Sequence, residues 1–162
     1  MNPTFDRALD LSLERIIRTS PQVVWDAWTD PARLQQWWLP APSLCRVEHL
    51  DVRPSGGFVT RMSEDGGASW VPHMNACFLA VDAGERLVFT NTVDSTWRPA
   101  APAPVHMTAT VTFDDHPEGT AYLVVVRHGD PAARDLHADL GFHEGWGSVT
   151  DQLTALAEAV TA

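Results

Sequence analysis

The C-terminal part of the chain carries the feature that most restricts its fold, an apolar stripe along one long helix. Large apolar residues recur there at alternating spacings of three and four, at Trp146, Val149, Leu153, Leu156 and Val160. This spacing places them on one face of an α-helix, and a helix with a single apolar face packs on a core. We therefore expect a long helix that opens at residues 130–131, runs to residue 160 and covers another layer of the protein.

The upstream part of the same predicted helix combines glycines with histidines and large aromatic rings. Gly141, Gly145 and Gly147 should each weaken a helix by about 1 kcal/mol relative to alanine, so a requirement other than helix stability is expected to explain them. One hypothesis is that this part of the helix forms the lid of a cavity. The alternative is that the glycines let the helix lie close to a sheet.

The pattern upstream predicts one strand, two short helices and a run of strands. Leu9, Leu11 and Leu13 alternate with polar residues, which is the period of a half-buried strand. A Ser-Pro at residues 20–21 and an Asp-Pro at residues 30–31 are typical helix starts. Further strands are expected over residues 45–52, 58–62, 74–81, 86–92, 107–113 and 120–128. This order predicts an α+β fold in which the long helix covers one face of an antiparallel sheet.

The charge and the residue content exclude several classes of function. The 11 basic residues against 21 acidic ones give a net charge of −10, which opposes binding to the phosphates of a nucleic acid. The chain contains no lysine, so a lysine Schiff base, a P-loop lysine and a kinase-type lysine are all excluded. A length of 162 residues fits a single domain over residues 1–162.

The sequence also carries expectations about the location of the protein. No segment approaches the roughly 20 consecutive apolar residues of a membrane span, and the first residues lack the apolar region of a signal peptide. Cys45 and Cys77 have no C-x-x-C spacing and lie in strand-like runs, so we expect free, buried thiols. We predict a cytoplasmic protein that does not associate with membranes.

Several segments together resemble a known superfamily. They are PQVVWDAWTDP at residues 21–31, WWLP at 37–40, RPSGG at 53–57, ERLVFT at 85–90 and GFHEGW at 141–146. The chain is similar across nearly its whole length to the START-like (SRPBCC) ligand-binding superfamily, in the branch homologous to the activator of the heat-shock protein 90 ATPase. The combination of the last segment with the first helix pair is the specific part of this resemblance.

The resemblance implies a helix-grip fold. In that fold a curved antiparallel sheet of about six to seven strands wraps around the long C-terminal helix, and two short helices between the first two strands close one end. An apolar cavity lies between the sheet and the long helix. Members of the superfamily include binders of hydrophobic small molecules, polyketide cyclase-like enzymes and chaperone-activating domains, so the activity has to be argued from the site itself.

The candidate site consists of aromatic walls and a few polar groups. Aromatic residues from the second short helix, the proline-rich segment 94–105 and the long helix would surround the cavity. On the last strand, alternation places Tyr122 and His128 on the face that the resemblance makes concave, where they would donate or accept hydrogen bonds. The predicted ligand-binding residues are Trp38, Trp97, Tyr122, His128, His137, Phe142 and Trp146. The alternative for Trp38 and Trp146 is that they are ordinary core residues.

The histidines are candidates for a metal site or for acid–base catalysis. His128, His137 and His143 with Asp139 would suit zinc, but His137 and His143 are six residues apart and point about 120° away from each other on a helix. We therefore predict no metal and no cofactor. His143 is expected to share a packed stripe with Leu140 and Trp146. His137 is the best catalytic candidate, as a neutral ligand contact or as a general acid and base.

The leading functional hypothesis is binding of a small apolar or aromatic molecule in the cavity. The first alternative is a cyclase or lyase that uses His137. The second alternative is an interaction domain that stimulates a chaperone ATPase. An exposed edge strand would support a homodimer.

Overall fold

The computed structural model describes residues 4–160 of the chain, and these residues form seven strands and four helices. Residues 1–3, where the segment examined for a signal peptide begins, lie outside the described residues, as do residues 161–162. In chain order the elements are β1 (Asp10–Ile17), α1 (Pro21–Thr29), α2 (Pro31–Leu34), β2 (Leu44–Leu50), β3 (Gly57–Ser63), β4 (Val71–Asp82), β5 (Arg86–Thr90), β6 (Thr108–His116), β7 (Gly119–Arg127), α3 (Pro131–Asp139) and α4 (Phe142–Val160).

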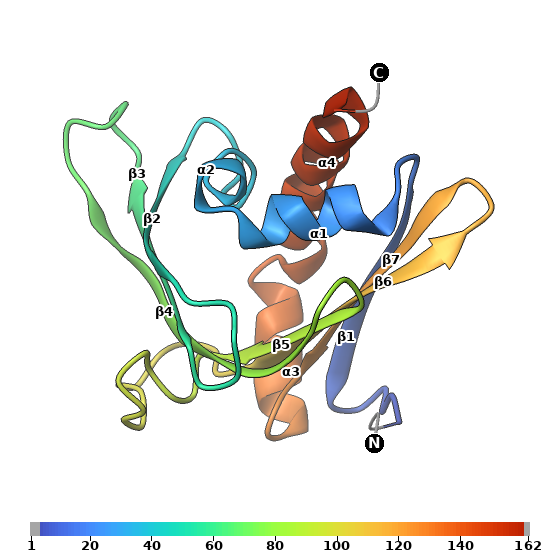
Figure 1. Cartoon of the computed structure of the whole chain (residues 1–162). Coiled ribbons are helices and arrows are strands. Elements are labelled where there is room, and N and C mark those ends of the chain that lie inside the picture. Colours follow the sequence, from blue (N-terminus) through green and yellow to red (C-terminus); the bar gives the residue numbers. More distant parts are fainter. Residues whose placement is uncertain (1–3, 161–162) are drawn as a thin grey trace.

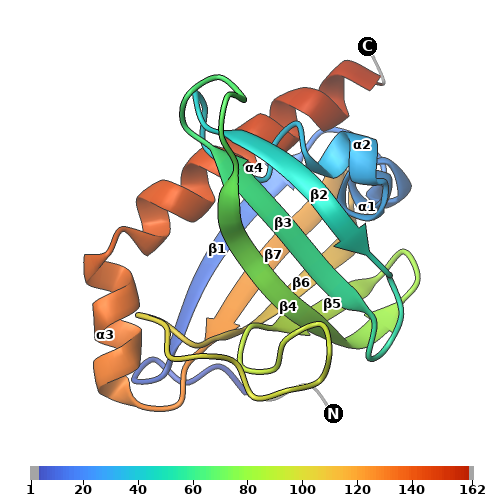
Figure 2. The same ribbon diagram turned by 90° about the vertical axis from the view of Figure 1, so that its left-hand side faces the viewer.

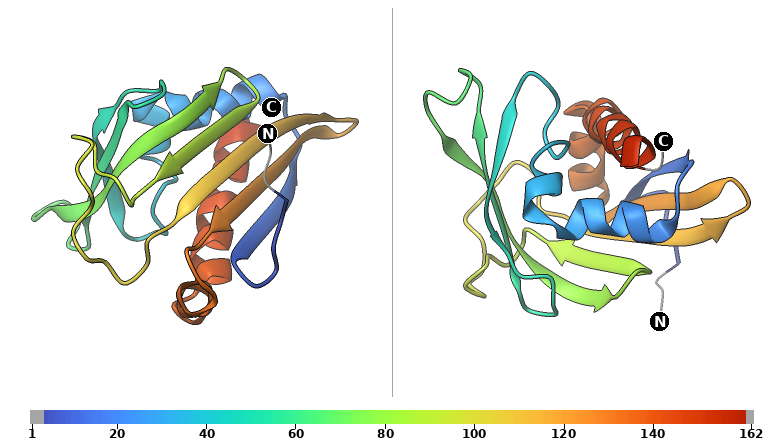
Figure 3. Two further views of the ribbon diagram at one scale, coloured as in Figure 1. Left: turned by 90° about the horizontal axis from the view of Figure 1, so that it is seen from below. Right: turned by 45° about the horizontal axis from the view of Figure 1, so that its top comes forward.

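The strands form one antiparallel sheet in the order β1-β7-β6-β5-β4-β3-β2. All neighbours from β2 to β7 follow one another along the chain, whereas β1 pairs with β7 because α1 and α2 carry the chain across to the far edge. Figure 1 shows the sheet curving around α1 and α4, and Figure 2 shows α4 lying across the strands from behind. The two further views in Figure 3 show the same enclosure from below and obliquely from above. The predicted helix-grip architecture is confirmed.

The short helices begin at the predicted residues, but only α2 has a side-chain cap, because Ser20 makes no capping hydrogen bond at the start of α1. Pro21 opens α1 and Pro31 opens α2, where the side chain of Asp30 accepts hydrogen bonds from the first turn. Asp130 caps α3 in the same way, accepting from the backbone N–H of Ala133 at 2.8 Å. None of the helices among the described residues is long and apolar enough to span a membrane.

The predicted long C-terminal helix is broken into two helices. Gly141 has a φ of +95°, a conformation that favours glycine, and it separates α3 from α4. Figure 2 shows the two helices running in different directions from this point. The expectation of one continuous helix is therefore wrong. The sequence has a helical pattern on both sides of Gly141, so the pattern alone did not indicate the break.

The apolar stripe of α4 packs as predicted over most of its length. Trp146, Val149 and Leu153 are buried, Leu156 is half-buried, and Val160 is exposed. The end of α4 extends beyond α1 in Figure 1, which explains the exposure of Val160. The stripe therefore positions α4 on the core from its first turns onward.

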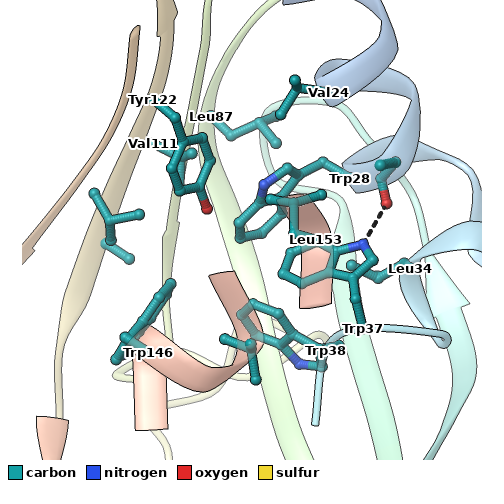
Figure 4. Packing of buried hydrophobic residues seen from close by; sticks show 14 of the residues in the cluster. Val24, Trp28, Leu34, Trp37, Trp38, Leu87, Val111, Tyr122, Trp146 and Leu153 are labelled. Atoms are coloured by element: carbon teal, nitrogen blue, oxygen red, sulfur yellow. Dashed lines mark hydrogen bonds between the residues drawn. The ribbon is translucent and has the colours of Figure 1, made fainter. Parts of the chain in front are cut away.

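A cluster of aromatic rings forms the core between α1, α4 and the sheet. The ring centroid of Trp28 lies 4.9 Å from that of Trp37 and 5.2 Å from that of Trp38. The indole N–H of Trp37 donates to the carbonyl of Ala27 at 2.9 Å, the bond drawn in Figure 4. Much of the high tryptophan content is thus ordinary core packing. Cys45 and Cys77 are free and buried, as predicted, and burial raises the pKa of both thiols.

Candidate ligand-binding site

A cavity of about 410 Å³ lies where the junction of α3 and α4 faces the sheet. This volume falls in the range of small-molecule sites in proteins, which are about 300–1,000 Å³. Most of its wall is apolar or aromatic, and its polar side chains are two histidines and an asparagine. The lining residues are Trp38, Leu39, Pro40, His73, Met74, Asn91, Pro104, Val105, Met107, His137, Leu140, Gly141, Phe142, Gly145, Trp146 and Val149.

One face of α4 forms a continuous part of this wall. Phe142, Gly145, Trp146 and Val149 follow the spacing i, i+3, i+4, i+7, which is one side of a helix. A Cβ atom added at Gly145 would meet no atom within 4 Å. The cavity therefore reaches the helix backbone at this position, and a side chain there would enter open space.

The glycines of this region do not bring the helix close to the sheet. The nearest atom to a Cβ added at Gly147 is Nη2 of Arg15 at 3.9 Å, which is ordinary contact. Gly145 has still more room, and Gly141 is explained by its positive φ. The alternative of close approach to the sheet is therefore wrong, and the open space at Gly145 agrees with the hypothesis of a cavity.

Gln152 on α4 holds the wall that follows α2. Its side-chain N–H group donates to the carbonyls of Trp37 at 3.0 Å and Leu39 at 2.8 Å. Its side-chain oxygen accepts from the backbone N–H of Ala41 at 2.8 Å. These bonds fix Trp38 and its neighbours against α4, and no sequence motif marked Gln152 for this role.

Asn91 holds a third part of the wall. Its side-chain N–H group donates to the carbonyl of Val105 at 3.0 Å, and its oxygen accepts from the backbone N–H of Met107 at 2.8 Å. The segment that precedes β6 is thereby attached to the end of β5. Pro104 and Val105, at the end of the proline-rich segment, consequently line the cavity.

Trp97 lies away from the cavity, contrary to the prediction. It is 65% exposed, and its indole N–H donates to the carbonyl of Ser55 at 2.7 Å. Asp94 accepts hydrogen bonds from the backbone N–H groups of Thr96 and Arg98, which forms a tight loop and turns the indole toward Ser55. Pro104 and Val105, later in the same segment, line the cavity instead of Trp97.

Tyr122 lies deeper in the core than the cavity wall. It is 1% exposed and faces Trp28 in Figure 4. Its hydroxyl, the indole N–H of Trp28 and the hydroxyl of Thr150 have no partner in good hydrogen-bond geometry among the described residues. The side chains of Trp28 and Thr150 are nevertheless close enough to favour the phenolate slightly, while burial raises the pKa of Tyr122 far more strongly. The phenol is therefore neutral at pH 7.

His128 and His137 form a hydrogen-bonded pair at the edge of the cavity. Nε2 of His128 lies 2.8 Å from Nδ1 of His137, and Nδ1 of His128 lies 2.8 Å from the carbonyl oxygen of Leu9. His137 lines the cavity, whereas His128 is behind it and does not. Burial, with a smaller contribution from His128, lowers the pKa of His137 to about 4.

The other histidines of the region are separate from this pair. His143 is exposed and so is Leu140, so the predicted stripe with Trp146 is wrong; α4 begins only at Phe142, after the break, and its buried face does not include position 143. His73 lies across the cavity, where desolvation of the ring lowers its pKa although part of the residue reaches solvent. Within residues 4–160 no group of three or more His, Cys, Asp or Glu side chains is arranged to hold a metal ion.

Comparisons with known proteins agree with this architecture. A family model described as activator of Hsp90 ATPase homolog 1-like protein matches residues 18–158. A solved structure of a protein from Nitrosomonas europaea is 37% identical, with a TM-score of 0.84 and coverage of 97% of this chain and 99% of that chain. No curated protein sequence gives a significant match.

More distant structures share the fold. A protein from Arthrobacter aurescens, at 20% identity, has a TM-score of 0.79 over 94% of this chain and 87% of that chain. An AHSA1-like protein from Aeromonas hydrophila, at 21% identity, has a TM-score of 0.66 over 94% of each chain. At these identities the similarity concerns the fold alone.

Proposed function

The chain belongs to the family of activator of Hsp90 ATPase homolog 1-like proteins, and on that premise we propose that it binds a small, mostly apolar molecule in the cavity between α4 and the sheet. The observation that carries the proposal is the cavity itself, with its volume of about 410 Å³ and its largely apolar wall. Concave apolar sites with a few polar groups are typical of small-molecule binding.

The rings in the wall favour a ligand with an aromatic part. The centroids of Trp38 and Trp146 lie 5.7 Å apart at an interplanar angle of 87°, and Phe142 lies 6.1 Å from Trp146. Flat, rigid rings at such angles offer both faces and edges to a planar guest. Of the predicted site residues, we retain Trp38, His137, Phe142 and Trp146 as direct contacts, and we assign His128 a supporting position behind His137.

The first experiment is native mass spectrometry of the purified protein, followed by extraction and identification of any bound molecule. A discrete added mass that is released on denaturation supports the proposal and identifies the chemical class of the ligand. A spectrum of the free protein moves the test to added probes, of which 2-naphthol is a suitable neutral one, because tryptophans in the wall report its binding by fluorescence.

A blocking variant tests whether the probe occupies this cavity. Gly145→Leu should abolish binding of 2-naphthol while the protein still folds, because the new side chain enters open space on the cavity face of α4. Ser148→Leu is the matched control, since it adds the same side chain to an exposed position of the same helix. Equal binding by both variants would place the ligand elsewhere.

Tryptophan variants provide a second matched pair. Trp38→Ala removes an indole from the cavity wall, whereas Trp97→Ala removes an exposed indole outside it. Only Trp38→Ala should weaken binding of 2-naphthol. If only Trp97→Ala weakened it, the assignment of the wall would be overturned.

Two other functions are tested by separate assays. A cyclase or lyase would use His137 as general acid and base, although an imidazole with a pKa of about 4 is a weak base at neutral pH. Evidence for such an enzyme would be turnover of a substrate by the wild-type protein that is lost in His137→Phe. The family description favours stimulation of a chaperone ATPase, which is measured by adding the protein to purified Hsp90 and following ATP hydrolysis.

A further inference from the structure

We propose that the cavity selects a ligand that presents an uncharged hydrogen-bond donor, a hydroxyl or an N–H group, to Nε2 of His137, and that His128 imposes this preference from behind the wall. The inference rests on the proposed binding function and adds the chemical class of the ligand. It is carried by a chain of hydrogen bonds that runs from the backbone of Leu9 through both imidazoles to the cavity.

The carbonyl of Leu9 determines which atom donates in each of these hydrogen bonds. The carbonyl oxygen of Leu9 can only accept, so Nδ1 of His128, 2.8 Å away, carries a hydrogen. A neutral imidazole has a single N–H group, and Nε2 of His128 is therefore an acceptor. Nδ1 of His137 lies 2.8 Å from that acceptor and must donate to it. The remaining nitrogen of His137, Nε2, is consequently left with an unshared electron pair.

This electron pair is available to a ligand. His137 belongs to the cavity wall, and no hydrogen bond to its Nε2 is formed by any residue from 4 to 160. The side chain of Asn91, also in the wall, already uses both its N–H group and its oxygen on the backbone of residues 105 and 107. His137 is thus a polar group of the wall whose ring is oriented and whose Nε2 is still free to accept. His73, the other histidine of the wall, lies 2.9 Å through its Nδ1 from Oγ1 of Thr60, a hydroxyl that can donate or accept, so its neighbours do not set its tautomer in the same way.

The surroundings of His137 favour its uncharged form. The rings of His128 and Phe142 pack against His137, each with centroids 5.1 Å away. Neither imidazole forms an ion pair with a carboxylate of the described chain. The lowered pKa of His137 agrees with a neutral ring at pH 7. A carboxylate or phosphate oxygen at this place would meet another electron pair and is therefore disfavoured.

The first test is an NMR measurement of the tautomers in the free protein. Nitrogen chemical shifts and ring couplings of ¹⁵N-labelled protein at pH 7 should show His128 and His137 both with hydrogen on Nδ1 and none on Nε2 of His137. A hydrogen on Nε2 of His137, in either the other tautomer or the cation, overturns the proposal without any ligand.

The second test compares 2-naphthol with 2-methoxynaphthalene, which keeps the oxygen but has no donor. The wild-type protein should bind 2-naphthol about fivefold more tightly, the effect of one neutral hydrogen bond. His137→Phe should bind both probes with similar affinity. Equal binding of both probes by the wild-type protein overturns this inference but leaves the proposed function standing, whereas binding of neither probe counts against the proposed function itself.

A third variant separates the positioning role of His128 from the steric role of His137. His128→Phe removes the acceptor that orients the His137 ring but leaves that ring in the wall. The preference for 2-naphthol should disappear while the affinity for 2-methoxynaphthalene changes little. If the folded variant, checked by its amide NMR spectrum, retains the full preference, His128 does not position His137.

Discussion

At the scale of single residues, His137 should make the stability of the fold depend on pH. Its pKa of about 4 in the folded protein lies below the usual value of 6.5, so the unfolded chain binds more protons between these values. The free energy of unfolding should therefore decrease as the pH falls from about 6.5 to about 4, by about 1 kcal/mol for a ring that is only partly buried. Urea denaturation should show that the free energy of unfolding of the wild-type protein, relative to that of His137→Leu, falls over this range. A difference that is constant with pH contradicts the prediction, and His143→Leu controls for loss of an exposed imidazole.

Gly145 and Gly141 should respond in opposite ways to alanine. Gly145→Ala should raise the free energy of unfolding by about 0.5–1 kcal/mol, because the position is helical and a Cβ atom there meets nothing. Gly141→Ala should lower it by about 1–2 kcal/mol, since a φ of +95° strains any residue with a side chain. Urea denaturation measures both. Destabilisation by Gly145→Ala would show that the open space at this position is smaller than the structure indicates.

At the scale of elements, Gln152 should account for a large part of the attachment of α4 to the wall after α2. Gln152→Leu should lower the free energy of unfolding by about 2–3 kcal/mol, because the buried carbonyls of Trp37 and Leu39 lose their donor. Gln36→Leu is the control, since Gln36 is exposed and its side chain, among residues 4–160, bonds only to the carbonyl of Ala32 one turn earlier. Thermal or urea unfolding measures the stability of both variants. Equal losses in the free energy of unfolding would contradict the role of Gln152 in attaching α4.

The elements also show what local sequence can and cannot predict. The strands and the short helices were predictable because alternation and Asp-Pro starts act within a few residues. The break at Gly141 was not, because α3 and α4 each have helical patterns and only the backbone conformation of one residue separates them. Phe142 and Trp146 were assigned to the wall because the family resemblance placed their helix against the cavity. The exposed position of Trp97 depends instead on a hydrogen bond to Ser55, 42 residues away.

At the scale of the whole molecule, the cavity is a product of long-range contacts. Its wall combines α4 with segments near residues 40, 74, 91 and 105, which no spacing in the sequence brings together. The family resemblance supplied the curved sheet and the enclosed helix, and these predicted that a cavity exists. The orienting roles of Gln152 and Asn91, and the bond between His128 and His137, were visible only in the structure. Gln152 bonds to a residue 115 positions away, whereas the two histidines are only nine residues apart and it is the orientation of their rings that no sequence pattern gives.

The topology predicts that the chain unfolds as one cooperative unit. β1, near the start of the chain, pairs with β7, and α4, near its end, packs on both α1 and β1. Every part of the core therefore depends on both halves of the chain, and no cut leaves a complete sheet. Tryptophan fluorescence, which reports mainly on the rings between α1 and α4, and far-UV circular dichroism, which reports on the backbone, should give coincident urea transitions. Two separated transitions would indicate that the sheet and the aromatic core unfold independently, and would contradict a single domain.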